Sequence, residues 1–353
     1  MGTQERKLYI DVLRIMATLM IMFNHTSTFG FALYTVRTDG ILYWIYLFLA
    51  ISAKTAVPIF FMISGGLLLE REETLETLLK KRFLRFVIVL LAGTASHYAY
   101  FANWERSELS MSGLVERVFS GNMVTPYWYL YSYLGFLLML PILRKLVSVL
   151  QTQDFVYLIG MYFLMKLLSV VQFLVWKGSI EHSPYFSFFI MGDNIFYPLL
   201  GYFVEHRLPQ KFYEKKYTYV AALSAIVTVG VCCVLTFLQS RLFDVWDEGS
   251  TQTFFNTFIF VPAGCLYFII KYWFAKHFVD EKISRKISAI GECTFGVYVF
   301  ETIYREETKR VLELLIQYFP TIIACGIWII CAFAMGSVVT LIIKQIPGIR
   351  KIF

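Results

Sequence analysis

The sequence predicts an all-α membrane protein, a polytopic bundle of about ten transmembrane helices with both termini in the cytoplasm. Of its 353 residues, 58% are hydrophobic and 16% are charged, whereas soluble domains carry about 25% charged residues. The mean hydropathy is +0.62. A soluble chain of this composition would expose large apolar patches and aggregate, so the composition excludes an ordinary soluble enzyme.

Ten apolar runs approach the length of about 20 residues that a helix needs to cross a bilayer. They cover residues 8–30, 42–69, 83–103, 126–148, 155–176, 185–204, 217–239, 252–274, 287–304 and 319–343. The second run is too long for one straight span and contains Pro58, which predicts a kink or a break there. The ninth run is the least apolar and continues into an amphipathic stretch over 306–318, a candidate interfacial helix.

The connections between these runs predict one integral membrane domain over residues 1–353. No loop exceeds about 25 residues, and none has a core-forming pattern. The first run is interrupted by Asp11 and Arg14 and is followed by no small-residue cleavage site, so we expect a retained helix and not a signal peptide.

The Lys and Arg residues at the ends of the runs and in the connections between them predict the orientation. They number 21 on the side of the N-terminus and 8 on the opposite side, and such residues favour the cytoplasmic face. The same bias accounts for the net charge of +7. We therefore expect no nucleic-acid partner.

The six cysteines all lie in apolar runs, with no Cys-x-x-Cys pair and no histidine at a zinc-like spacing. They are typical of small core residues with free thiols. We expect neither a disulfide framework nor a metal site.

Ionisable residues inside the runs are the candidates for function, because a charge at membrane depth is costly and usually faces a partner or a polar cavity. They are Asp11, Arg14, His25, Lys54, His97, Lys166, Asp193 and Glu301. For the two lysines we favour the interpretation that a flexible side chain reaches toward the membrane surface.

The first run places three of these residues on one stripe. At about 100° per residue, Asp11, Arg14 and His25 fall within roughly 60° of one another. At a rise of 1.5 Å per residue, His25 lies about 16 Å from Arg14 and about 21 Å from Asp11 along the axis. Asp11 can therefore pair with Arg14 one turn away, whereas the group that orients His25 must come from another helix.

This stripe favours a long ligand with phosphates at one end and a reactive group at the other. A guanidinium near the cytoplasm suits a phosphate, and an imidazole deeper in the membrane suits proton transfer near neutral pH. Acyl-CoA has that shape. The alternative is structural: His25 is a packing residue, and Asp11 and Arg14 are a pair at a helix start.

Two motifs resemble the acyltransferase 3 family of membrane-bound acyltransferases, which O-acylate bacterial glycans and related acceptors. The first is the basic, Asp, Leu-Arg and Ala pattern of residues 6–17 followed by Asn24 and His25. The second is the Phe-Phe-x-x-Ser-Gly pattern within residues 58–68, followed by the basic stretch 81–85. Weaker similarities lie at residues 127–130, Pro141, 200–202 and 294–298.

The resemblance implies a membrane O-acyltransferase, with roles for five residues. His25 is expected to be the catalytic general base on the acceptor hydroxyl, and an acyl-imidazole intermediate is the less favoured variant. Arg14, held by Asp11, is expected to contact CoA phosphates or carbonyls. Arg82 and Arg85 are expected either to hold the nucleotide at the cytoplasmic mouth or only to anchor the chain there.

Three further residues are candidate assisting groups. Where many members of the family have a histidine in the ninth span, this chain has Glu301, which is expected to accept a proton or to orient the imidazole unless the acceptor differs. Ser64, beside two glycines, is expected to permit close helix approach more than to act as a nucleophile. Trp128 is expected to belong to an interfacial aromatic belt first and to a sugar platform second.

The expected reaction is transfer of an acyl group, acetyl in the first instance, from cytoplasmic acyl-CoA to a hydroxyl of a cell-surface glycan or glycolipid. Acetyl-CoA is then a donor substrate, with no permanently bound cofactor. The expected partners are a glycan or lipid-linked saccharide acceptor and the lipids of a bacterial plasma membrane. We see no fused extracytoplasmic domain, so a stand-alone enzyme or a separate partner protein is expected. The alternatives are a transporter or flippase and a non-catalytic component of polysaccharide assembly.

Overall fold

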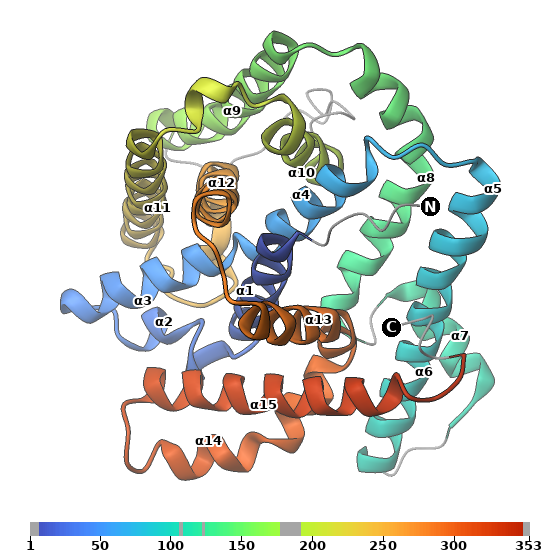
Figure 1. Ribbon diagram of the computed structural model, residues 1–353. Coiled ribbons are helices and arrows are strands. Elements are labelled where there is room, and N and C mark those ends of the chain that lie inside the picture. The colour runs from blue at the N-terminus through green and yellow to red at the C-terminus, as the bar shows by residue number, and fades with distance from the viewer. Residues whose placement is uncertain (1–6, 106–108, 122–123, 177–191, 349–353) are drawn as a thin grey trace. The chain divides into compact units, whose positions relative to one another are not determined.

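The computed structural model describes residues 7–105, 109–121, 124–176 and 192–348 (Figure 1). All regular structure in these residues is helical, which confirms the all-α class. Residues 185–191 of the sixth predicted span lie outside the described part of the chain. The chain divides into two compact units, unit 1 with residues 1–70 and 144–287, and unit 2 with residues 71–143 and 288–353.

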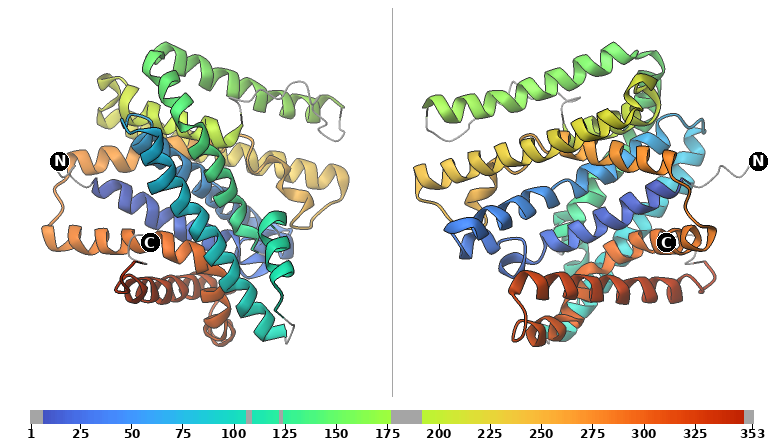
Figure 2. Two further views of the ribbon diagram at one scale, coloured as in Figure 1. Left: turned by 90° about the vertical axis from the view of Figure 1, so that its right-hand side faces the viewer. Right: turned by 60° about the vertical axis from the view of Figure 1, so that its left-hand side comes forward.

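Unit 1 is built around the first helix. Its helices are α1 (Leu8–Asn24), α2 (Leu33–Val36), α3 (Gly40–Ala53), α4 (Ala56–Leu68), α9 (Thr152–Trp176), α10 (Asp193–Tyr202), α11 (Lys215–Phe243) and α12 (Phe260–Lys276). Helix α1 packs against α4 and α12, α4 packs against α10, and α11 packs against α12. In the right view of Figure 2, α1 (dark blue), α3 (blue) and α11 (yellow) run in similar directions. The core of unit 1 therefore surrounds the stripe that the sequence singles out.

The second predicted span is broken, as expected from Pro58. The break falls at Lys54 and Thr55, between α3 and α4. Proline has no backbone N–H, and its ring clashes with the carbonyl four residues earlier, which here belongs to Lys54. The kink therefore lies one turn before the residue that causes it.

Helices α4 and α10 approach each other through two glycines. A Cβ atom at Gly65 would overlap the carbonyl of Pro198, and a Cβ atom at Gly201 would overlap the carbonyl of Met62. The contact is reciprocal, because each helix presents its glycine to the backbone of the other. Close approach at small residues is typical of helix pairs in membranes.

Unit 2 consists of the central and C-terminal helices. They are α5 (Leu75–Thr77), α6 (Leu84–Glu105), α7 (Met111–Ser120), most of α8 (Trp128–Val149), most of α13 (Glu281–Glu307), α14 (Lys309–Leu315) and α15 (Thr321–Ile343). A π-helical segment, Leu78–Phe83, leads into α6. Gly296 of α13 lies against Thr340 of α15, and Gly336 of α15 lies against Tyr304 of α13, so this pair also meets at glycines.

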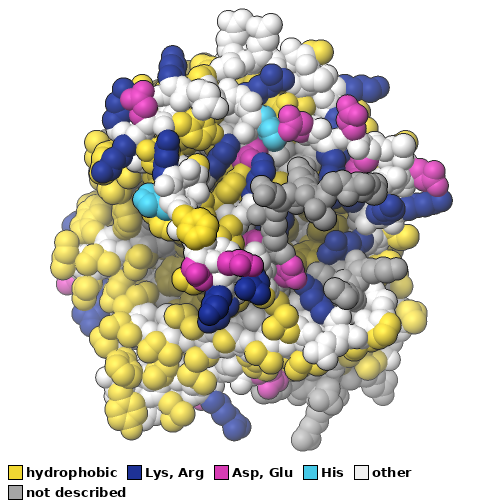
Figure 3. Space-filling view, viewed as in Figure 1, with side chains coloured by type: hydrophobic (Ala, Val, Ile, Leu, Met, Phe, Trp, Pro, Cys, Tyr) yellow, Lys and Arg dark blue, Asp and Glu magenta, His cyan; other side chains and the backbone are white. Residues whose placement is uncertain are grey.

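Five helical segments of the described chain are long and apolar enough to cross a membrane: Gly40–Leu68, Trp128–Val149, Thr152–Val175, Lys215–Phe243 and Thr321–Ile343. Apolar side chains of α11, such as Leu223 and Ile226, are exposed, and hydrophobic side chains cover this side of unit 1 on the left of Figure 3. Exposed apolar surface of this extent marks a membrane protein. The count of ten spans and the cytoplasmic position of the termini remain predictions.

Several predicted boundaries differ from the helices observed. The first span was expected to reach residue 30, but α1 ends at Asn24. The hydroxyl of Thr26 donates to the carbonyl of Phe23 and accepts from the N–H of Phe31, and such local hydrogen bonds compete with a helix. In the predicted amphipathic stretch 306–318, the helix α14 covers only Lys309–Leu315.

Candidate active site

Helix α1 carries the predicted stripe of polar residues. The packing of its apolar face determines how the helix, and with it the stripe, is oriented. Ile10, Leu13, Ala17 and Ile21 are buried, and their spacing of three and four residues is that of one helix face. Asp11 lies in the first turn, where a negative charge is favoured by the helix dipole. The packing of this face therefore determines where the polar side chains of α1 lie.

Asp11 and Arg14 form the predicted ion pair. The guanidinium Nη1 of Arg14 lies 3.5 Å from Oδ1 of Asp11. The side chain of Asp11 is 1% exposed, whereas that of Arg14 is 34% exposed. A guanidinium has five N–H donors, so Arg14 can pair with Asp11 and still present donors to a ligand.

His25 lies at the C-terminal cap of α1, and its side chain is half-buried. Its backbone N–H bonds to the carbonyls of Met22 and Phe23, so the position of the residue is set by the last turn of the helix. Because α1 is continuous from Arg14 to Asn24, the axial separation of about 16 Å between Arg14 and His25 applies. That the group which orients the imidazole comes from another helix stays a prediction.

The end of α1 is attached to the kink between α3 and α4. The amide Nδ2 of Asn24 donates to the carbonyl of Ala53 at 3.1 Å. The next residue, Lys54, donates to Oε1 of Gln252 at 2.9 Å, and its ammonium lies 4.5 Å from the centre of the Phe31 ring. The side chain of Lys54 is thus held by polar and aromatic partners within unit 1, which the interpretation of a surface-seeking lysine did not foresee.

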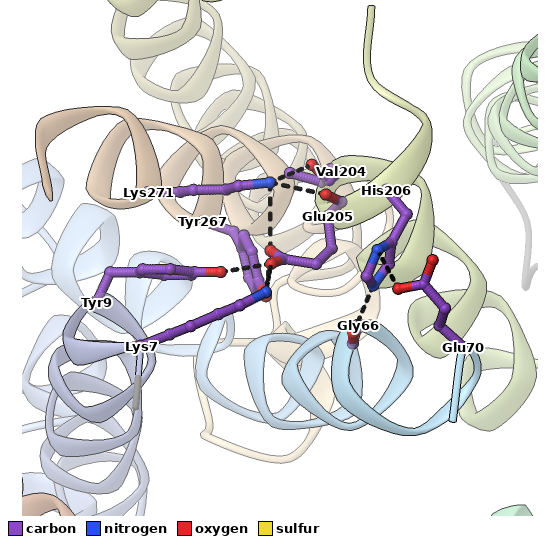
Figure 4. Close-up of polar contacts among 9 residues, drawn as sticks. All are labelled: Lys7, Tyr9, Gly66, Glu70, Val204, Glu205, His206, Tyr267 and Lys271. Atoms are coloured by element: carbon purple, nitrogen blue, oxygen red, sulfur yellow. Dashed lines mark hydrogen bonds and ion pairs between the residues drawn. The ribbon is translucent and has the colours of Figure 1, made fainter. Parts of the chain in front are cut away.

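A second polar cluster, which the sequence did not reveal, lies at the opposite end of α1 (Figure 4). Its centre is Glu205, whose side chain is 2% exposed. One carboxylate oxygen accepts from Lys7 and Tyr9, and the other lies 3.3 Å from both the Tyr267 hydroxyl and the Lys271 ammonium. All four donors therefore converge on one buried carboxylate.

The charge of Glu205 is stabilised by these partners. Burial alone would raise the pKa of this carboxyl, but attraction to Lys271 and the hydrogen bonds from Lys7 and Tyr9 outweigh it, so the pKa of Glu205 is lowered. Lys271 also donates to the backbone carbonyls of Val204 and Glu205. The cluster thereby joins α1, α12 and the π-helical segment Phe203–Arg207 that follows α10.

Next to this cluster, His206 connects the π-helical segment to the end of α4 (Figure 4). Its Nε2 lies 2.7 Å from the carbonyl of Gly66, and its Nδ1 lies 2.7 Å from Oε2 of Glu70.

In the same unit Lys166 lies 3.6 Å from Asp193. Tyr162 donates to Asp193 at 2.6 Å.

The predicted nucleotide-holding residues Arg82 and Arg85 belong to unit 2. Nε of Arg82 lies 2.9 and 3.0 Å from the two carboxylate oxygens of Glu73. Arg85 lies over the ring of Phe295, 5.9 Å from its centre. Both arginines are half-buried, so each guanidinium already has an internal partner, and their role toward a nucleotide stays a proposal.

Glu301 is also in unit 2, just after a break in α13. Phe300 departs from helical geometry with φ −113° and ψ 16°. Glu301 is buried, and its Oε2 accepts from Nε of Arg305 at 2.6 Å. The carboxylate lies within Coulombic reach of His97 and Tyr127. The sequence identified Glu301 and His97 separately, but their proximity comes from folding.

Ser64 and Trp128 lie in different units, and their expected roles stay predictions. The hydroxyl of Ser64 donates to the carbonyl of Phe60 one turn earlier, and its neighbour Gly65 makes the close contact with α10 described above. Trp128 is 51% exposed at the start of α8. Neither a nucleophilic serine nor a sugar platform follows from these positions.

The predicted site residues are distributed over both units. Asp11, Arg14, His25 and Ser64 lie in unit 1, and Arg82, Arg85, Trp128 and Glu301 lie in unit 2. Within the described residues, no three His, Cys, Asp or Glu side chains gather as metal ligands. In unit 1, a half-buried imidazole can serve as an acid or a base, and a partly exposed guanidinium can bind an anion.

The comparisons with known proteins give one match. A family model described as an acyltransferase domain matches residues 7–343, which include all the site residues named above. No curated protein and no solved structure matches the chain.

Proposed function

This chain belongs to the acyltransferase 3 family, and from that membership we propose that it moves an acyl group, acetyl in the first instance, from cytoplasmic acyl-CoA to a hydroxyl of a cell-surface glycan or glycolipid. The family match supports acyl transfer in a membrane. The donor, the acceptor and the acetyl group are the parts that we propose, together with a plasma membrane location.

The observation that carries the proposal is the layout of α1. A partly exposed guanidinium, held by a buried carboxylate, lies about 16 Å along the helix from a titratable imidazole. In acyl-CoA the anionic nucleotide and the thioester are separated by the long pantetheine arm. Helix α1 can therefore contact the nucleotide through Arg14 while His25 serves the thioester end.

The proposed reaction is a direct transfer with His25 as the general base. The imidazole takes the proton of the acceptor hydroxyl while its oxygen forms a bond to the thioester carbonyl carbon. The carbon–sulfur bond then breaks, and the leaving thiolate of CoA receives a proton from the imidazolium. The products are an O-acylated acceptor and free CoA thiol.

The test is thiol release from acetyl-CoA by native membranes that contain the protein and its acceptor. His25→Ala is expected to lower the rate by about 10²- to 10⁴-fold, the usual contribution of a positioned base. The matched control is His277→Ala, because His277 is exposed at the end of α12. Full activity of the His25 variant, at equal amounts of protein, would remove this residue from the mechanism.

The acceptor is identified by a separate measurement. Mass spectrometry of cell-surface glycans, with and without the gene, is expected to show an ester that is lost in the deletion strain. A transporter or flippase would instead release no thiol from acetyl-CoA in the membrane assay.

A further inference from the structure

Lys54, at the break between α3 and α4, is a cation without an acidic partner at ion-pair distance among the residues that the structure describes. It is half-buried and lies within the candidate membrane span Gly40–Leu68. Its ammonium donates to the neutral amide oxygen of Gln252 at 2.9 Å and lies 4.5 Å from the centre of the Phe31 ring. An ammonium has three N–H donors, and Gln252 occupies one of them. A charge in this setting is costly and marks a candidate for function.

The other lysine inside the predicted spans has a different environment. Lys166 of α9 lies 3.6 Å from a carboxylate oxygen of Asp193. Glu248 is a carboxylate whose charge acts on Lys54, but it accepts from the Ser27 hydroxyl at 3.0 Å and forms no ion pair with the lysine. The structure therefore gives Lys166 a counter-ion and leaves the charge of Lys54 without one.

The ammonium of Lys54 lies at the same end of α1 as His25. Asn24, directly before His25, donates at 3.1 Å to the backbone carbonyl that precedes Lys54. The hydroxyl of Thr26, directly after His25, accepts from the N–H of Phe31 at 2.9 Å, and Phe31 carries the ring that the ammonium covers. Both neighbours of His25 in the chain are thus joined to the surroundings of Lys54, and all these residues belong to unit 1.

The charges of the proposed reaction indicate what a cation can do at this place. The thioester and the acceptor hydroxyl are both neutral at the start. When the acceptor oxygen bonds to the carbonyl carbon, the carbonyl oxygen takes the electron pair of the C=O bond and becomes negative. A cation without a counter-ion stabilises this oxyanion more than it stabilises the neutral thioester, and only such a difference raises the rate.

We propose that Lys54 is a second catalytic residue, whose ammonium donates a hydrogen bond to the carbonyl oxygen of the thioester and stabilises the oxyanion that forms there. His25 takes the proton of the acceptor hydroxyl, and Lys54 keeps all its protons. When the C=O bond forms again, the thiolate of CoA leaves and takes the proton of the imidazolium. Gln252 and Phe31 hold the ammonium without neutralising it. This inference rests on the proposed function, because the acyl thioester is the donor there.

The test is the kinetics of thiol release from acetyl-CoA in native membranes that contain the acceptor. Lys54→Met keeps a long side chain without the charge, and we expect kcat to fall by about 10²- to 10³-fold, the usual cost of removing one oxyanion donor. The KM for acetyl-CoA is expected to stay within about twofold, because the lost interaction forms only in the transition state. Lys54→Arg keeps a cation and is expected to recover part of the lost kcat. The matched control is Lys166→Met, which is expected to leave kcat nearly unchanged.

Binding of CoA to the purified protein separates a lost catalytic group from a misfolded protein. CoA has the nucleotide and the pantetheine arm but no acyl carbonyl. Its affinity for Lys54→Met is therefore expected to equal its affinity for the wild-type protein, whereas Arg14→Ala is expected to weaken the binding.

Three results would overturn the inference. One is an unchanged kcat in Lys54→Met at equal amounts of protein. Another is a raised KM for the acceptor with unchanged kcat, which would assign Lys54 to the binding of an acidic acceptor. The third is weaker binding of CoA by Lys54→Met, which would assign the lysine to the fold or to the donor site. If the wild-type protein releases no thiol from acetyl-CoA, the proposed function fails together with this inference. Normal release by the wild-type protein with any of the three results removes the inference alone.

Discussion

The side chains of Asp11 and Arg14, which form an ion pair, differ in their exposure to solvent. This difference indicates different roles for the two residues. The carboxylate is 1% exposed and the guanidinium 34%, so the buried partner holds the exposed one. In the proposed function, Asp11 therefore acts on the donor only through Arg14.

Arg14→Ala is expected to raise KM for acetyl-CoA by about tenfold or more, since a hydrogen bond to a charged group is worth about 1.5–3 kcal/mol. Asp11→Asn is expected to raise it less, and the double variant should match Arg14→Ala because one residue acts through the other. The measurement is initial-rate kinetics in membranes. Arg285→Ala, at an exposed position, is the control. An unchanged KM in Arg14→Ala would refute the role.

Glu205 makes unit 1 sensitive to acid. Because its pKa is lowered in the folded protein, its charge stabilises the fold at neutral pH, and this contribution is lost as the pH falls through the folded-state pKa. Glu205→Gln is expected to lower stability at pH 7 by about 3 kcal/mol, the cost of breaking a buried pair. The difference from the wild-type protein should shrink toward pH 4. Unfolding in detergent as a function of pH measures both effects, and a difference that is constant with pH would contradict this assignment.

At the scale of helices, the local features were predictable and the long-range ones were not. The kink before Pro58 and the ion pair of Asp11 with Arg14 each depend on residues three or four positions apart. Both features could therefore be predicted from the sequence. In the Glu205 cluster, by contrast, the partners lie far from Glu205 in the sequence. The separation is 198 positions for Lys7, 196 for Tyr9 and 62 for Tyr267. No periodic pattern in the sequence links such residues. In the sequence, Lys7 could not be distinguished from the other basic residues on the predicted cytoplasmic side.

The proximity of His97 and Glu301 was missed for the same reason. Each was recognisable as an ionisable residue inside an apolar run, but they lie on different helices. The end of α1 was misplaced because Thr26 bonds to nearby backbone groups, an effect that hydropathy does not report. The membrane class, by contrast, followed from composition alone.

The contact between α4 and α10 predicts a sharp difference between glycines. Gly65→Ala is expected to destabilise the protein by about 3 kcal/mol, because the new methyl group would overlap the backbone of Pro198. Gly160→Ala in α9, which meets no atom within 4 Å, is expected to be neutral or to stabilise by about 0.5–1 kcal/mol. Unfolding in mixed micelles compares the two. Equal effects would mean that the α4–α10 contact is looser than described.

At the scale of the whole molecule, both units contribute residues that the family match covers. Unit 1 holds Asp11, Arg14 and His25, and unit 2 holds His97, Glu301 and the two arginines near the start of α6. Variants in either unit are therefore informative about acyl transfer. The orientation of the chain in the membrane determines from which side each substrate arrives.

The predicted orientation is testable with a matched pair of exposed glutamates in unit 2. Glu72→Cys is expected to face the cytoplasm and Glu116→Cys the opposite side, and both positions are exposed. A membrane-impermeant maleimide on intact cells should label only the Glu116 variant, and permeabilised cells should show both. The wild-type protein is the control, since its described cysteines are buried or half-buried. The reverse pattern would invert the orientation.

The reciprocal glycine contact of α4 with α10 also limits how unit 1 can move during turnover. Two backbones in direct contact at two points cannot slide past each other or rotate independently, because no flexible side chain lies between them to absorb the displacement. We therefore expect α4 and α10 to move together as one rigid body. If a substrate enters unit 1 as proposed, we expect the movement that admits it to hinge at the break at Lys54 and Thr55, next to the hydrogen bond from Asn24 at the end of α1 to the carbonyl of Ala53.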